Sequence, residues 1–187
     1  MILSDIQIVE MLKLGEIFID PFDEKYLQGA SYDLHLGNEF LIFDTLKMTH
    51  IDPKVNLDNM MKSIIIKDDE SFIIHPQEFA LALVKETTGV GSQLVGRLEG
   101  KSSVGRLGLM VHVTAGFLDP KNCLKMTLEL HNTTSLPIIL YPNMPIAQMA
   151  FETLTSPTSR PYNKVKTSKY VGDSSPKSSQ MWKNFVT

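Results

Sequence analysis

The stretch Lys125-Met-Thr-Leu-Glu-Leu-His131 alternates strictly between polar and apolar side chains. Because successive side chains of a β-strand point to opposite faces, this alternation predicts a strand with one buried face. The apolar side chains would face the core: Met126, Leu128 and Leu130. The stretch therefore favours a β-rich fold and leaves one carboxylate, Glu129, on the face away from the core.

Short apolar or alternating runs of the same kind occur on both sides of this strand. They are Ser31–Leu36, Phe40–Phe43, Ser63–Ile66, Ser71–Ile74, Phe79–Val84, Leu94–Leu98, Pro137–Tyr141 and Ile146–Phe151. Turn-forming pairs such as Gly37-Asn38 and Asp119-Pro120 separate them. One helix is expected before them, because Ser4 to Gln7 has capping-box spacing and Gly15 can end it. The chain is therefore predicted to be a mostly β sandwich, jelly roll or barrel with an N-terminal helix.

Composition limits the class of protein. The 187 residues are 43% hydrophobic and 21% charged, as in one globular domain. A single cysteine, Cys123, excludes an internal disulfide and a cysteine-based zinc site, and favours a cytoplasmic location. No apolar run approaches the ~20 residues that cross a bilayer, so we expect no membrane anchor. A net charge of -3 argues against nucleic-acid binding.

The charges are unevenly distributed. Residues 155–187 hold six basic residues against one acidic residue, so this tail carries +5 and residues 1–154 carry -8. A disordered tail is one interpretation of its Ser/Thr/Pro/Lys-rich composition. Its aromatic residues, among them Tyr162, Tyr170 and Trp182, favour a tail that packs over an anionic ligand or a neighbouring subunit. We therefore divide the chain into a β domain, 1–154, and a covering tail, 155–187.

Two places could carry chemistry. Between Gly96 and Arg106 glycines alternate with basic and hydroxyl side chains, a composition suited to phosphate binding. Gly96 and Gly100 enclose three residues, so the spacing is not that of a nucleotide-triphosphatase loop, and a solvated turn remains the alternative. Glu129 is a candidate general acid/base if its face lines a pocket. The five histidines show no metalloprotease spacing and are interpreted as packing or surface residues.

Three motifs closely resemble the dCTP deaminase family, which is related to the trimeric dUTPases. They are Glu99-Gly-Lys-Ser-Ser-Val-Gly-Arg-Leu-Gly-Leu109, His112-Val-Thr-Ala-Gly-Phe-Leu-Asp-Pro120 and Thr127-Leu-Glu-Leu-His-Asn132. Gln28–Gly37 is similar to the family's early strand motif, and Tyr162 with Ser168–Gly172 to its C-terminal nucleotide-covering segment. The resemblance implies a distorted β-barrel or jelly-roll homotrimer. Its active sites would lie between subunits, and Mg²⁺ would accompany the triphosphate without a zinc ion.

The resemblance also implies roles for individual residues. Glu129 would activate the water that attacks C4 of cytosine, and Ser102 and Arg106 would hold that water and stabilise the tetrahedral state. Asp119 would lie by the deoxyribose. The remaining substrate-binding residues would contact the phosphates or the base: Lys101, Ser103, Val113, Thr114, Ala115, Gly116, Tyr162, Lys169 and Tyr170.

The resemblance implies hydrolytic deamination of dCTP, which releases ammonia. Because Gly116 is typical of bifunctional members, it also implies cleavage of the triphosphate to give dUMP. In that second step Asp119 or a water beside it would act. Zinc deaminases use a His and two Cys ligands, which one cysteine cannot supply. The alternatives are a deaminase releasing only dUTP, a dUTPase without deaminase activity, and a non-catalytic nucleotide-binding trimer. dTTP is a further possible ligand.

Two departures from the family pattern fall near the expected site. Lys121 and Leu124 replace glycines after Asp119, so the turn there is expected to change shape, because glycine is used where φ is positive. Asp173 stands where the family tends to have Gln. A carboxylate ~4 Å from a phosphate would cost roughly 4 kcal/mol at an effective dielectric of about 20. Asp173 would then turn away, hold Mg²⁺ or weaken the tail's grip.

Overall fold

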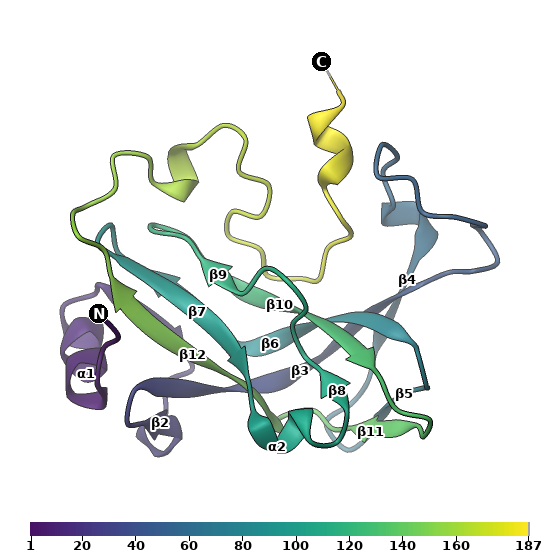
Figure 1. The fold of residues 1–187 in the computed structure, drawn as a ribbon, viewed down its shortest axis with the longest axis horizontal. Coiled ribbons are helices and arrows are strands. Elements are labelled where there is room, and N and C mark those ends of the chain that lie inside the picture. Colours follow the sequence, from purple (N-terminus) through teal and green to yellow (C-terminus); the bar gives the residue numbers. More distant parts are fainter. Residues whose placement is uncertain (187) are drawn as a thin grey trace.

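The computed structural model describes residues 1–186, and strands dominate it (Figure 1). The strands are β1 (Ile17–Asp20), β2 (Leu27–Gln28), β3 (Ser31–Phe43), β4 (Met61–Ile65), β5 (Phe72–Ile74), β6 (Phe79–Val90), β7 (Leu94–Gly100), β8 (Leu109–Met110), β9 (Phe117–Leu118), β10 (Cys123–Asn132), β11 (Ile138–Leu140) and β12 (Pro145–Thr153). The helices are α1 (Asp5–Lys13) and α2 (Ser102–Gly105), with 3-10 turns η1 (Glu24–Tyr26), η2 (Asp58–Met60), η3 (Tyr162–Lys164) and η4 (Met181–Asn184).

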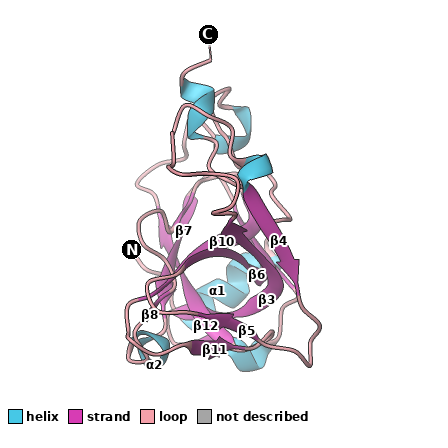
Figure 2. Cartoon of the chain, turned by 90° about the vertical axis from the view of Figure 1, so that its right-hand side faces the viewer, coloured by secondary structure: helices cyan, strands magenta, loops and turns pink. Residues whose placement is uncertain are grey.

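Ten of the strands form one antiparallel sheet that curls around the core (Figure 2). Its main order is β8-β10-β6-β3-β12-β7-β9, with β1 added to β6 and with β2 and β4 added to β3. The remaining two strands, β5 and β11, pair with each other. This mostly β, half-closed barrel confirms the predicted fold class. No helix within residues 1–186 is long and apolar enough to cross a membrane.

β10 has the alternating burial that its sequence predicts. Met126 is 5% exposed, and Leu128 and Leu130 are fully buried, whereas Glu129 is only half-buried. β10 pairs along its length with β6, which places Glu129 opposite Leu81. Burial of each such leucine contributes about 1.5–3 kcal/mol, so the core face fixes the register and with it the direction of Glu129.

The predicted turn at Gly37-Asn38 is wrong. β3 runs unbroken from Ser31 to Phe43 and joins the two predicted runs on either side of that pair. The register with β6 shifts between Leu36 and Phe40, which marks a bulge rather than a turn. A Cβ at Gly37 would lie 3.0 Å from the Leu83 carbonyl oxygen, so the glycine permits the close approach of β6.

The N-terminal helix forms as predicted, and the backbone N–H of Ser4 donates to Gln7 Oε1 at 3.2 Å. The C-terminal tail folds back over one end of the sheet (Figure 1). Its backbone is hydrogen-bonded to the body, since Tyr162 N donates to Pro120 O at 3.0 Å and Lys125 N donates to Asp173 O at 2.9 Å. The described part of the tail therefore packs against the domain, as its aromatic residues led us to expect.

Candidate active site

A cavity of about 390 Å³ lies between the face of β10 that carries Glu129 and the C-terminal tail. Glu129, Ala115 and Asp119 belong to its wall, and Tyr162 and Tyr170 of the tail cover it. Five predicted site residues therefore come together in one cavity.

The carboxylate of Glu129 is held by backbone donors. Its Oε2 accepts hydrogen bonds from the N–H of Val113 at 3.2 Å and of Thr114 at 3.3 Å. The backbone N–H of Glu129 in turn donates to Val111 O at 3.2 Å. The segment 111–114 thus lies along β10 and fixes the carboxylate inside the cavity, as a base that orients a water molecule requires.

Gly116 lies where no side chain fits. Its carbonyl oxygen accepts from Leu98 N at 2.7 Å, and a Cβ at this position would lie 2.6 Å from the Leu98 carbonyl oxygen. That Cβ would also lie 3.1 Å from Cδ2 of His112. Glycine therefore lets the loop that contacts Glu129 approach β7.

His112 is a wall residue that sequence reasoning missed. Both of its ring nitrogens are buried and have no hydrogen-bond partner among residues 1–186. Buried polar atoms are normally hydrogen-bonded, so an unpartnered imidazole beside a cavity marks the place as unusual. The one signal in the sequence was its position directly before Val113. The sequence does not reveal whether a histidine on this loop points inward.

Asp119 lines the cavity at the turn after β9. Burial raises the pKa of its carboxyl above the usual 3.8, because the charged form loses water contacts. No side-chain partner for this carboxylate exists within residues 1–186. It is therefore a carboxyl that a ligand could engage.

In the turn that follows Asp119, a residue other than glycine adopts the left-handed backbone conformation. Lys121 adopts φ of 62°, and its N–H donates to Val90 O at 3.0 Å. A lysine therefore holds a positive φ at this position, and the expected difference of the turn from the family pattern stays a prediction. This backbone hydrogen bond holds Lys121 in a conformation that costs roughly 1–2 kcal/mol for an L-residue. Leu124, the second glycine replacement, is 8% exposed and forms an apolar part of the cavity wall with Met126.

The tail closes the cavity through its aromatic residues. The Tyr162 hydroxyl accepts from Tyr170 N at 3.3 Å, and the Tyr170 hydroxyl accepts from Gln180 N at 3.0 Å. Lys169 lies in a neighbouring hollow of about 370 Å³ with Tyr162 and Asp119. Asp173 is buried and forms an ion pair with Lys177, so its side chain does not turn out to solvent.

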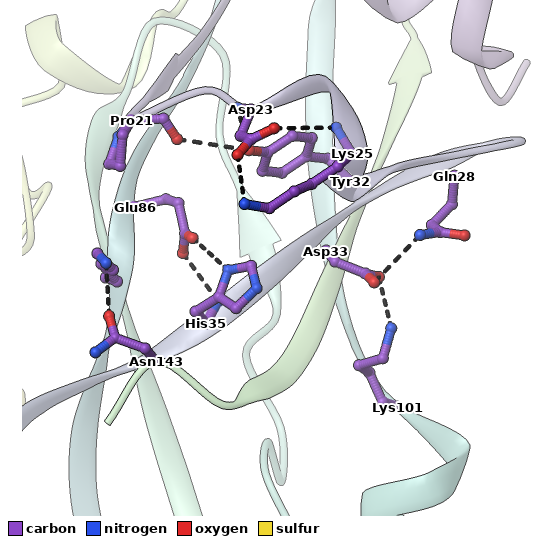
Figure 3. A network of polar contacts seen from close by, with 11 residues as sticks. Pro21, Asp23, Lys25, Gln28, Tyr32, Asp33, His35, Glu86, Lys101 and Asn143 are labelled. Atoms are coloured by element: carbon purple, nitrogen blue, oxygen red, sulfur yellow. Dashed lines mark hydrogen bonds and ion pairs between the residues drawn. The ribbon is translucent and has the colours of Figure 1, made fainter. Parts of the chain in front are cut away.

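The residues between Gly96 and Arg106 that are suited to phosphate binding lie outside the Glu129 cavity. Ser102, Ser103 and Arg106 are exposed on and beside α2, and none of them lines the Glu129 cavity. Lys101 is tied to β3, because its Nζ lies 2.6 Å from Oδ1 of Asp33 (Figure 3). The same carboxylate accepts from Gln28 Nε2 at 3.3 Å.

The predicted site is thus divided into two parts within one chain. The Glu129 cavity lies under the tail. α2 lies at the end of the molecule away from the tail in Figure 1 and contacts β8, which pairs with β10 at His131 and Asn132. No hydrogen bond or ion pair joins Glu129 to α2 within the described chain. Residues 1–186 also contain no group of three or more His, Cys, Asp or Glu placed to hold a metal ion.

The curled β sheet, its tail-covered cavity and a carboxylate held by backbone donors define a ligand-binding β protein. The family model described as dCTP deaminase-like matches residues 2–154. The chain belongs to this dCTP deaminase-like family.

Named relatives match along nearly the whole chain. The dUMP-forming dCTP deaminase of Corynebacterium jeikeium is 47% identical over 186 residues and 99% of both chains. The protein of that name from Methanobrevibacter smithii is 45% identical over 96% of this chain and 95% of its own. The structure of the 2'-deoxycytidine 5'-triphosphate deaminase from Agrobacterium tumefaciens superposes with a TM-score of 0.64 at 18% identity. That match covers 81% of this chain and 48% of the other, so it bears on the fold.

Proposed function

We propose that this protein deaminates dCTP by hydrolysis and carries the product on to dUMP. The observation that carries the proposal is the position of Glu129 on the wall of a tail-covered cavity, with its carboxylate held by two backbone N–H groups. The relatives named above as dUMP-forming dCTP deaminases support the same activity.

Glu129 is the general base in this proposal. It takes a proton from a water molecule that attacks C4 of cytosine, and it passes a proton to the amino group, which leaves as ammonia. The backbone donors at Val113 and Thr114 keep the carboxylate aimed into the cavity. The two protons of the water are thus accounted for, because one ends on ring N3 of the uracil product and the other leaves with the ammonia.

Ser102 and Arg106 act from a neighbouring subunit. Their exposure, and their absence from the wall of the cavity within residues 1–186, support a site shared between copies. In a homotrimer each cavity receives α2 of the next subunit, whose Ser102 and Arg106 stabilise the tetrahedral intermediate. Lys101 and Ser103 then contact the phosphates.

Mg²⁺ accompanies the phosphate chain. Magnesium prefers oxygen ligands and is commonly held by one or two carboxylates together with substrate phosphates. Asp119 fits that role, because it lines both the cavity and the neighbouring hollow that contains Lys169, and its carboxylate has no side-chain partner among residues 1–186. When bound, the ion would neutralise charge on the phosphates while Asp119 orients the water of the second hydrolysis.

The remaining assignments concern the tail and the setting. The β domain comprises residues 1–154, and residues 155–187 form a tail that covers the nucleotide. Tyr162, Lys169 and Tyr170 of this tail contact the phosphates and the base. Val113, Thr114, Ala115 and Gly116 read the base edge. dUTP and dTTP are further ligands. Neither a nucleic acid nor a membrane is a partner in this proposal, and the protein works in the cytoplasm.

Product analysis tests the proposal. Purified protein with dCTP and Mg²⁺ should release ammonia and pyrophosphate in equal amounts and form dUMP. Formation of ammonia and dUTP from dCTP would show a deaminase that stops after one step. Release of pyrophosphate from added dUTP, without ammonia from dCTP, would show a dUTPase. Absence of turnover with either nucleotide, together with saturable binding, would identify a regulatory nucleotide-binding protein and reject the enzymatic proposal.

A further inference from the structure

The Glu129 cavity has the wrong balance of charge for a triphosphate. Three carboxylates line it, those of Asp119, Glu129 and Asp173. Lys177 supplies the one ammonium or guanidinium group in its wall among residues 1–186. The interior therefore suits an uncharged pyrimidine ring, and a phosphate chain attached to that ring must leave the cavity where cations lie.

Cations gather on the tail side of the cavity. Lys169, Lys177 and Lys183 line an adjacent hollow of about 400 Å³. Lys177 lines both this hollow and the Glu129 cavity. Its side chain therefore stands at the boundary between the place for the base and the basic side of the tail.

Lys177 is held there by a buried carboxylate. It forms an ion pair with Asp173, whose side chain is 4% exposed, while that of Lys177 is 45% exposed. The position of Asp173 is fixed by the main chain, because its carbonyl oxygen accepts from Lys125 N of β10 at 2.9 Å. An ammonium group has three protons to donate, so contact with one carboxylate leaves it able to bind a further anion.

We propose that Lys177 is a triphosphate-binding residue of the tail and that Asp173 is the buried counter-ion that aims its ammonium group. The proposal rests on the proposed function, because it takes the ligand to be a deoxycytidine triphosphate. Pairing also explains how a carboxylate is tolerated beside a phosphate site, since the pair brings no net charge to it. Asp173 thus acts through Lys177 as a positioning residue.

Steady-state kinetics of the full-length protein with dCTP test the proposal in four variants. Lys177→Met removes the ammonium, Asp173→Asn removes the charge but keeps an oxygen acceptor, and the double variant removes both charges. Lys166→Met is the control, because Lys166 is an exposed tail lysine outside both hollows. We expect Lys177→Met to raise KM roughly 10- to 100-fold with kcat within about threefold, because hydrogen bonds to charged groups contribute this much.

The double variant separates phosphate binding from a latch that merely holds the tail. We expect its KM to stay raised, and Asp173→Asn alone to raise KM by a smaller factor than Lys177→Met, because the amide keeps an oxygen acceptor but loses the charge that aims the ammonium group. Rescue of KM in the double variant would mean that Lys177→Met acts by leaving Asp173 buried without a partner, and would overturn the proposal. An equal rise in both single variants, or no rise in Lys177→Met, would also overturn it.

Fluorescence of Trp182, the single tryptophan, reports tail docking in the nucleotide-free protein. We expect the same emission in wild type and in the double variant, whereas a shift in that variant would favour the latch. If wild-type protein releases no ammonia from dCTP, the proposed function fails by itself. Equilibrium dialysis of dCTP against the same four variants then tests Lys177 independently.

Discussion

Nζ of Lys101 lies 2.6 Å from Oδ1 of Asp33, and this contact joins the start of α2 to the central strand β3. The side chains are 23% and 11% exposed, so the pair is largely shielded from solvent. Gln28 Nε2 donates to the same carboxylate (Figure 3). Because α2 carries Ser102 and stands beside Arg106, Asp33 fixes the part of the site that a neighbouring subunit would use.

Replacement of Asp33 by Asn should loosen this connection. The neutral amide still accepts one hydrogen bond but loses the charge that pairs with Lys101, so the free energy of unfolding should fall by about 1–2 kcal/mol. Urea unfolding at fixed protein concentration measures the change. Asp69→Asn, at an exposed turn, is the matched control. Equal stability of the two variants would show that the pair contributes nothing to the fold.

Replacement of Glu129 by Gln should remove catalysis and leave binding. The amide oxygen can still accept from Val113 and Thr114, so the cavity keeps its shape, but no base remains to take a proton from water. Ammonia release from dCTP should fall by about 10²–10⁴, with dCTP binding within a few-fold of wild type. Glu10→Gln on α1 should behave as wild type. Turnover of Glu129→Gln within a few-fold of wild type would reject the base assignment.

The sequence predicted features of the fold and site that depend on local pattern. Alternation in β10 placed Glu129 off the core face, and the motif around it predicted that Ala115, Asp119 and the tail tyrosines would share its surroundings. The bulge in β3 was missed because it depends on the approach of Leu83 from β6, which no local pattern encodes. The inward direction of His112 and the pairing of Lys177 with Asp173 also arise from tertiary packing.

Replacement of Lys121 by Gly should stabilise the protein. Lys121 has φ of 62°, which costs an L-residue roughly 1–2 kcal/mol, whereas glycine pays about 0.5–1 kcal/mol of extra chain entropy. The net gain should be ~0.5 kcal/mol, seen as a rise in Tm of about 1–2 °C by calorimetry. Lys121→Ala keeps the Cβ and should show no gain. A lower Tm for the glycine variant would mean that the lysine side chain makes a compensating contact.

Replacement of Asp119 by Asn should change stability in a pH-dependent way. Burial raises the pKa of this carboxyl in the folded protein above 3.8, so the folded state binds the proton more tightly than the unfolded state. Ionisation of Asp119 therefore lowers stability as pH rises above 3.8. The Asn variant should have the higher Tm at pH 7, and the difference should vanish below pH 3.8. A difference that grows on acidification would contradict the direction of the pKa shift.

Truncation after residue 154 should raise the KM for dCTP sharply. The tail supplies Tyr162 and Tyr170 to the cavity, and its loss exposes the apolar wall made by Leu124 and Met126 to solvent. Base and phosphates would then bind in an open groove, with weaker electrostatic contacts in water of high dielectric. Truncation after Trp182 is the matched control, because it keeps both tyrosines and the Asp173–Lys177 pair. An unchanged KM in the shorter protein would show that the tail does not cover the nucleotide, since the cavity wall on β10 would then bind it unaided.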